Sequence, residues 1–250
     1  MQQFPTLTFS DCEESLVMMR SSEEVLPRMD HRPSMVATFW DSTVGKKIVM
    51  AVTGAIGLGY LIAHMTGNLL VFRGPNKIDA YAGLLKSNLG LLWVARAILL
   101  AAIIAHIVAA FQLARISQNS RPIAYKRWRP VGSDFASRTM RWTGPIVGIF
   151  IVYHLLHFTL GTVHPDFHQG EVYHNVTTGF RVWYVAAFYI VAVLALFGHL
   201  YHGAWSMFQS VGLNHPKYNK LVRTLATIIT IVVVVGFISI PVAILLDLIS

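Results

Sequence analysis

Six histidines of this chain lie within long apolar stretches, where an ionisable side chain is costly and usually has a function. Neutral imidazole is a common axial ligand of haem iron, and helix bundles build cofactor sites from side chains on facing helices. A lone buried histidine more often hydrogen-bonds a neighbouring helix, but here four successive stretches contain histidines. The pattern therefore favours haem ligation. The six are His64, His106, His154, His157, His199 and His202.

Five apolar stretches must position these histidines, and each is long enough to cross a bilayer, since about 20 helical residues span a hydrocarbon core of about 30 Å. The composition agrees, because 54% of the residues are hydrophobic and 13% are charged, against about a quarter charged in soluble domains. Strands of a membrane barrel would be shorter and would alternate in polarity. The sequence predicts an all-α membrane protein, a five-helix bundle within residues 46–250. The spans are 48–72, 89–114, 142–163, 183–211 and 225–246.

Lys and Arg residues are distributed unequally between the two sides of these spans. Residues 46–47, 115–141 and 217–223 hold twelve of them, and the opposite side holds four. Cytoplasmic loops of membrane proteins carry such an excess, so the N-terminus is predicted to be cytoplasmic and the C-terminus outside. The net charge of +8 is thus explained by membrane topology and contact with anionic lipid, and no nucleic-acid partner is predicted.

The first 45 residues are polar and contain several acidic side chains, so no cleavable signal peptide is predicted. Residues 1–45 are interpreted as a cytoplasmic tail that is flexible or peripheral. Cys12 is the only cysteine, which excludes an intrachain disulfide and a thiolate cluster for zinc or iron–sulfur. No residue of the tail suggests chemistry.

The depths of four histidines follow from the helical rise of about 1.5 Å per residue. His64 lies roughly 24 Å and His154 roughly 18 Å from the cytoplasmic edge. The second and fourth spans run in the opposite direction, and His106 and His199 lie about 12 and 13 Å from that edge. The four form an outer pair, His64 with His154, and an inner pair, His106 with His199. Two such pairs would hold two haems stacked across the membrane.

Depth alone leaves some choices open. His157 matches the depth of His64 slightly better than His154 does, and His202 competes with His199 in the same way. One member of each close pair would ligate iron, and the other would contact a haem propionate or a quinone. Arg96, about 15 Å outward of His106, would pair with a propionate or extend to the outer interface.

Other classes of site and function are less consistent with the composition of the spans. Zinc and di-iron sites usually include carboxylates or thiolates, and proton pumps or cation transporters normally contain carboxylates within the membrane. The spans offer no Asp or Glu apart from Asp247 at the extreme end. A transporter with a histidine-lined path remains the alternative from a different class, and it would lack a haem absorption band.

Four short motifs occur in order along the chain. Leu61–Asn68 reads LIAHMTGN, and Ala105-His106-Ile107 is followed by Phe111. Arg141-Trp142-Thr143-Gly144 precedes Tyr153-His154, and His199 lies four residues before Gly203-Ala204-Trp205-Ser206. This ordered set resembles the di-haem cytochrome b subunit of succinate:menaquinone oxidoreductases and the related fumarate reductases, over roughly residues 40–250.

The resemblance implies specific ligands, cofactors and partners. It selects His154 over His157 and His199 over His202 as ligands of two b haems, and implies the pairs that depth suggested. It implies an iron–sulfur and a flavoprotein subunit on the cytoplasmic face of a bacterial cytoplasmic membrane. Electrons from succinate would pass through the haems to menaquinone or another quinone, in a succinate dehydrogenase (quinone) complex whose flavin chemistry is not in this subunit.

Some features differ from the family or stay open. A glutamate that certain fumarate reductases place two residues before the fourth-span histidine is Phe197 here, which argues against their transmembrane proton path. The anchor of another respiratory dehydrogenase, or a stand-alone haem reductase, is the closest alternative function. No catalytic residue is identified. Candidate quinone ligands near the outer face are His157, Asp79, His164, Asp166, His168 and Glu171.

Overall fold

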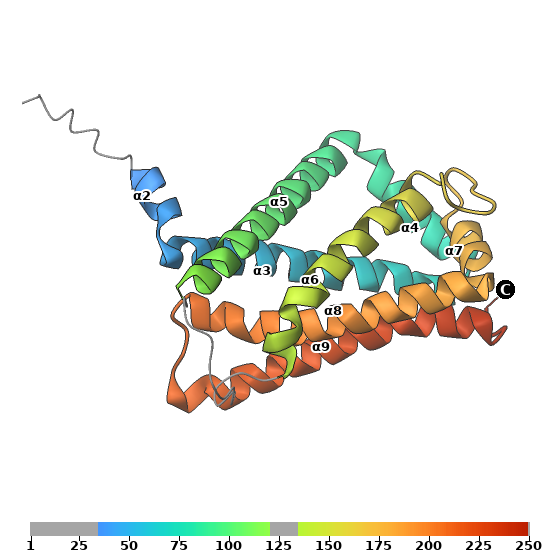
Figure 1. Ribbon diagram of the computed structural model, residues 1–250. Helices are drawn as coiled ribbons and strands as arrows, with labels where there is room; N and C mark the ends of the chain where they lie inside the picture. Colours follow the sequence, from blue (N-terminus) through green and yellow to red (C-terminus); the bar gives the residue numbers. More distant parts are fainter. Residues whose placement is uncertain (1–34, 121–134, 250) are drawn as a thin grey trace, which may run out of the picture. The chain divides into compact units, whose positions relative to one another are not determined.

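The computed structural model describes residues 35–120 and 135–249, and every regular element within them is a helix (Figure 1). The chain divides into two compact units, Met1–Thr38 and Phe39–Ser250. Nearly all of the first unit, and with it most of the predicted tail 1–45, lies outside the described residues. The second unit contains all the long helices.

Among the described residues of the second unit, five helices are long and apolar enough to cross a membrane. The predicted all-α, five-span fold is therefore confirmed. They are α3 with a following 3₁₀ turn (Thr43–Arg73), α5 (Leu89–Asn119), α6 with a following π-helical turn (Phe135–Thr159), α8 (Trp183–Ser210) and α9 (Pro216–Leu245).

Three short helices were not expected from hydropathy, because each lacks a long apolar run. They are α2 (Met35–Asp41), α4 (Pro75–Ser87) and α7 (Val172–Arg181). Helix α4 starts with Pro75, whose missing N–H costs nothing in a first turn. The carboxylate of Asp79 on α4 accepts the backbone N–H of Tyr173 at 3.0 Å, which joins α4 to the start of α7.

Helices α5 and α6 extend beyond the apolar stretches that predicted them. Arg115 lies on α5 and Arg138 and Arg141 lie on α6, so these residues are helical and not part of a long loop. An arginine tolerates this position because its alkyl stem packs on apolar surface while the guanidinium reaches water. The other basic residues of the predicted loop, at 121–129, lie outside the described residues.

Helix α8 is central to the packing of the spans. It packs against α3, α6 and α9, whereas α5 packs mainly along α3 (Figure 1). Two apolar cores hold these helices together, one around Val71, Tyr189 and Ile244 and the other around Met65 and Val233. The pairs α3–α6 and α5–α8 are not among the close-packed pairs of the described residues.

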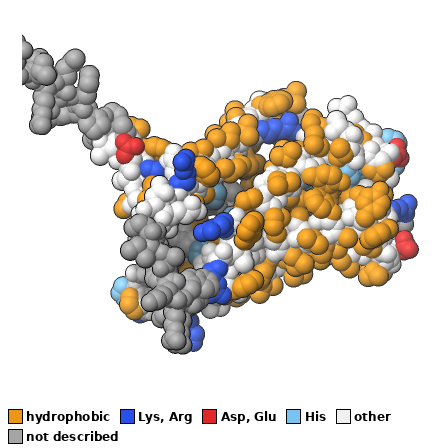
Figure 2. Space-filling view, in the orientation of Figure 1, with side chains coloured by type: hydrophobic (Ala, Val, Ile, Leu, Met, Phe, Trp, Pro, Cys, Tyr) orange, Lys and Arg blue, Asp and Glu red, His pale blue; other side chains and the backbone are white. Residues whose placement is uncertain are grey.

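The outer surface of the spans is apolar. Figure 2 shows hydrophobic side chains over much of one face of the helices. Large apolar side chains such as Ile98, Phe111, Ile149 and Val191 are more than half exposed. An exposed apolar surface of this extent is expected where lipid covers the protein.

Candidate functional site

The inner histidine pair lies between α5 and α8. The ring centroids of His106 and His199 are 6.2 Å apart, with an angle of 56° between the ring planes. Their backbones are not close-packed, so the two side chains approach each other across a wider space between the helices. The structure thus brings together the two residues that depth paired.

The outer pair lies between α3 and α6. The ring centroids of His64 and His154 are 5.8 Å apart, with an angle of 84° between the planes. Both helices pack against α8 rather than closely against each other. The second pair suggested by depth is therefore also adjacent in space.

The spacing within each pair suits two axial ligands of one iron. A metal–imidazole bond of about 2.0 Å puts a ring centroid about 3 Å from the metal, so two axial imidazoles have centroids roughly 6 Å apart. The observed values of 5.8 and 6.2 Å agree. Direct hydrogen bonding between two imidazoles would put the ring centroids about 5 Å apart, and no such bond joins either pair among the described residues.

Several glycines of the spans are not in close helix contact. Among the described residues, no heavy atom lies within 4 Å of a Cβ built at Gly57, Gly148 or Gly203. Close helix packing would put neighbouring atoms there, so these three glycines do not mediate tight helix contacts. Gly54 and Gly144, in contrast, lie beside the inner histidines, because a Cβ built at either would lie 3.7 Å from His106 Cε1 or 3.8 Å from His199 Cε1.

Thr53 on α3 favours the tautomer of His106 in which Nδ1 carries the hydrogen. Its hydroxyl donates its single hydrogen to the carbonyl of Val49 at 2.7 Å, so its oxygen accepts the Nδ1–H of His106 at 3.0 Å. The lone pair of His106 Nε2 is then available to a metal, as in most metal-ligating histidines. Sequence reasoning missed Thr53, because nothing in its spacing relates it to a histidine on the next span.

Each pair also contains a ring nitrogen that the protein does not satisfy. The Nδ1 atoms of His154 and His199, like Nε2 of His157 outside the pairs, are buried and have no hydrogen-bond partner among the described residues. Leaving a buried polar atom unpaired costs about 1–3 kcal/mol, so such atoms are few in native proteins and call for an explanation. A bound group that completes the site would supply one. The histidine pairs therefore fit two haems.

His64 is oriented by its neighbours on α3 and α9. Tyr60 stacks on its ring with centroids 5.3 Å apart, and the Asn68 side-chain amide donates to its Nε2 at 3.3 Å. Phe237 lies against the same ring at 5.9 Å. Helix α9 comes this close because Gly236 has no Cβ, which would lie 2.6 Å from the sulfur of Met65.

His157 points away from the outer pair because α6 changes its winding after His154. The N–H of Leu160 donates to the carbonyl of Leu155, five residues earlier, which defines a π-helical turn. His157 is fully buried, and its Nδ1 lies 3.0 Å from the hydroxyl of Tyr189. No ring contact joins His157 to His64 within the described residues, so the geometry favours His154 over His157.

Arg96 and His202 lie on α5 and α8, the two helices that carry the inner histidine pair. The guanidinium of Arg96 lies over the ring of Trp93, 5.1 Å from its centroid, and Arg96 is exposed. This cation–π contact fits an arginine that extends toward the interface. His202 follows His199 by one turn, and the ring next to His106 is that of His199.

The candidate quinone ligands near the outer end come from α4, from the π-helical turn that follows α6, and from the connection after that turn. His164 stacks on His157 with centroids 4.8 Å apart, whereas Asp79 caps the start of α7. Asp166, His168 and Glu171 lie together in the connection between α6 and α8. His164 also accepts the backbone N–H of Asp166, so successive contacts connect His157 to Glu171, whereas Asp79 lies on α4.

Part of the chain matches a known protein family. Residues 117–238 match the model of the succinate dehydrogenase/fumarate reductase transmembrane subunit. The chain is similar to this family over just under half of its length. No curated protein and no solved structure matches the chain. Together with the five apolar helices of the described residues, this similarity indicates a multi-pass membrane protein.

The match covers only part of the histidine constellation. It runs from the end of α5 into α9, so it includes His154 and His199 and leaves out His64 and His106. The case for the latter two as members of this subunit's site therefore rests on the geometry of the two ring pairs.

Proposed function

We propose that this subunit is a di-haem cytochrome b anchor of a succinate:quinone oxidoreductase. His64 and His154 would hold the outer haem, and His106 and His199 the inner haem. The observation that supports this most is the occurrence of two imidazole pairs at axial spacing, 5.8 and 6.2 Å, between helices that are not close-packed. When bound, the two haems would supply one-electron carriers between an iron–sulfur subunit and menaquinone or another quinone.

The protein's own side chains would prepare these sites. Thr53 holds His106 in the tautomer with a free Nε2, and Tyr60 and Phe237 fix the ring of His64. The surrounding apolar helices keep water away from both pairs, and exclusion of water is one of the features that sets a haem potential. Arg96 and His202 are proposed to contact propionates or quinone, and His157 to support the outer site through Tyr189.

The haem content of the purified complex tests this proposal. We expect two b haems per chain, both released by acid and organic solvent, because the sequence has no Cys-x-x-Cys-His for covalent attachment. The pyridine haemochrome assay gives the number, and flavoprotein and iron–sulfur subunits should co-purify. One haem, or none, in a well-folded preparation would contradict the di-haem proposal.

We also propose that the N-terminus and tail 1–45 face the cytoplasm of a bacterial cell, where the partner subunits would bind. Because Cys12 is the only cysteine, single-cysteine labelling is straightforward in a Cys12→Ser background. The positive-inside bias predicts that Lys77→Cys on α4 reacts with an impermeant maleimide in intact cells, and that Lys217→Cys on α9 does not. Lys77 and Lys217 are both exposed, so each variant should react in permeabilised cells. The reverse pattern in intact cells would invert the topology.

A further inference from the structure

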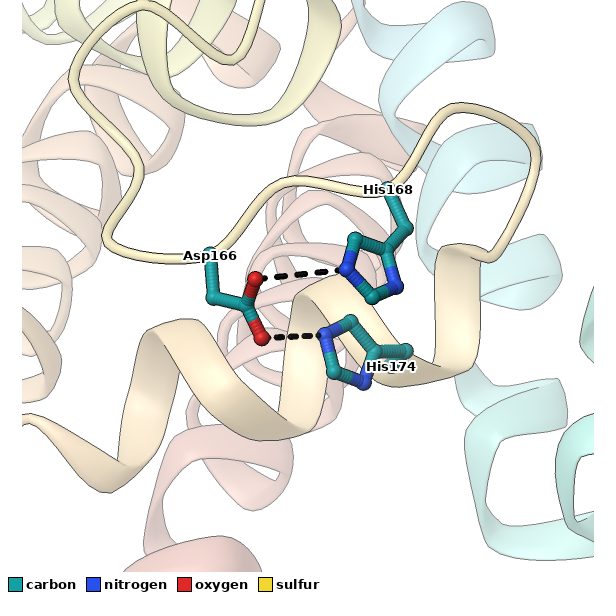
Figure 3. A group of neighbouring side chains, drawn as sticks. All are labelled: Asp166, His168 and His174. Carbon is teal, nitrogen blue, oxygen red and sulfur yellow. Dashed lines mark hydrogen bonds and ion pairs between the residues drawn. The ribbon is translucent and has the colours of Figure 1, made fainter.

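The connection between α6 and α8 brings together three side chains that the proposed haem sites do not use. Asp166 and His168 of this connection lie against His174 of α7 (Figure 3). Asp166 Oδ1 lies 3.3 Å from His168 Nε2, and Asp166 Oδ2 lies 3.0 Å from His174 Nε2. The two imidazole rings are parallel within 7° and have centroids 4.3 Å apart. The carboxylate of Asp166 therefore faces the Nε2 atom of each histidine.

We propose that Asp166, His168 and His174 bind a divalent transition-metal ion, with zinc as the type. Imidazole nitrogen and carboxylate oxygen are ligands that zinc prefers. Bonds of about 2.0 Å in a tetrahedral site put neighbouring ligand atoms about 3.3 Å apart. The ligand atoms of the three residues all lie within 4.8 Å of one another, so small side-chain rotations would close the site. A fourth position remains for water or another ligand.

The charge and exposure of the three side chains suit a bound cation. The two stacked imidazoles have centroids 4.3 Å apart and present their Nε2 atoms to one carboxylate. Metal ligation uses neutral imidazoles, and the carboxylate balances part of the charge of the ion. The side chains are 54%, 49% and 32% exposed, in the order Asp166, His168 and His174, so an ion can enter from solvent.

Glu171 completes the orientation of His168. Its Oε2 lies 3.3 Å from His168 Nδ1, the ring nitrogen opposite the one that faces Asp166. A metal-ligating histidine usually donates its other N–H to a carboxylate or carbonyl, which fixes the tautomer and raises the basicity of the ligand. Glu171 is therefore a positioning residue of the site.

Asn175 and His164 hold the connection in place. Buried Asn175 accepts the backbone N–H of His168 and donates to its carbonyl, both at 2.8 Å. His164 donates from Nε2 to the carbonyl of Asn175 and accepts the N–H of Asp166 at Nδ1. Both nitrogens of His164 are thus engaged, which excludes it as a ligand. Gly170, with φ of 101°, makes the turn that returns the chain to α7.

Zinc binding by the purified complex, prepared without a polyhistidine tag, tests the site independently of haem. After treatment with a chelator and dialysis, we expect one tightly bound zinc per chain by equilibrium dialysis and elemental analysis. The zinc X-ray absorption spectrum should contain the scattering of two imidazoles. His174→Gln should weaken binding by about 100-fold or more, and Glu171→Gln by about 10-fold, because ligand and positioning residues contribute unequally.

His215→Gln is the matched control. His215 is an exposed histidine at the start of α9 and lies in a different connection. This variant should bind zinc as the unmodified complex does. Equal binding by the complex and its His174→Gln variant, or an all-oxygen zinc environment, would overturn the proposal. If His174→Gln does not assemble, the absorption spectrum of the unmodified complex and the Glu171→Gln variant still decide the question.

Discussion

Replacing His106 or His199 with alanine is expected to remove the same haem, the inner one, and to leave the outer haem in place. The two rings lie 6.2 Å apart across α5 and α8, so each would supply one axial bond to one iron. Loss of either bond also leaves a cavity, and some variants will fail to assemble for that reason. In those that reach the membrane, the pyridine haemochrome assay should fall from two haems to one, and a redox titration should retain only the outer component.

Thr53→Val tests the inner site more mildly, because it changes the surroundings of His106 without removing either proposed ligand. Valine keeps the shape of threonine but removes the acceptor for His106 Nδ1–H. Both haems should remain, and the inner haem potential should rise, because a less basic imidazole stabilises the ferric state less. A tenfold change in the relative affinity for the two oxidation states corresponds to about 59 mV. If His106→Ala and His64→Ala lose the same haem, the proposed pairing is wrong.

Alanine variants of His154 and His157 should differ in haem content. His154→Ala is expected to remove the outer haem, because the ring of His154 is the one 5.8 Å from His64. His157→Ala should keep both haems and destabilise the protein by roughly 1–3 kcal/mol, since it empties a fully buried position and breaks the contact with Tyr189. Haem content and thermal unfolding distinguish the two variants. Loss of one haem in His157→Ala, with both retained in His154→Ala, would reverse the choice of ligand.

The transmembrane architecture was predictable because hydropathy is a property of whole stretches. Charge-free runs such as 48–72 identify spans without any knowledge of packing. The depth argument was equally robust, because it needs only the helical rise and the direction of each span. It paired the histidines of the first and third spans and those of the second and fourth, and left His157 and His202 open as alternatives. The adjacent rings in the structure are His64 with His154 and His106 with His199. Their role as haem ligands stays a prediction.

Other features could not be predicted, because they depend on contacts between residues far apart in the chain or on local winding. The sequence does not distinguish Thr53 from the other threonines of the apolar spans, because only the packing of α5 against α3 brings His106 beside it. The choice between His154 and His157 was open because regular helical geometry puts both on one face. Asp166, His168 and His174 appeared as ordinary loop residues, since only the fold of the connection brings His174 back to them.

The π-helical turn after His154 has a consequence for comparing this subunit with its relatives. A turn closed by a bond from Leu160 to Leu155 contains one residue more than an α-helical turn would. Relatives whose third span is α-helical throughout should therefore align with a one-residue gap between positions 155 and 159. A motif that counts residues from His154 into the following connection would be out of register by one, and would assign the role of His157 to a neighbouring position.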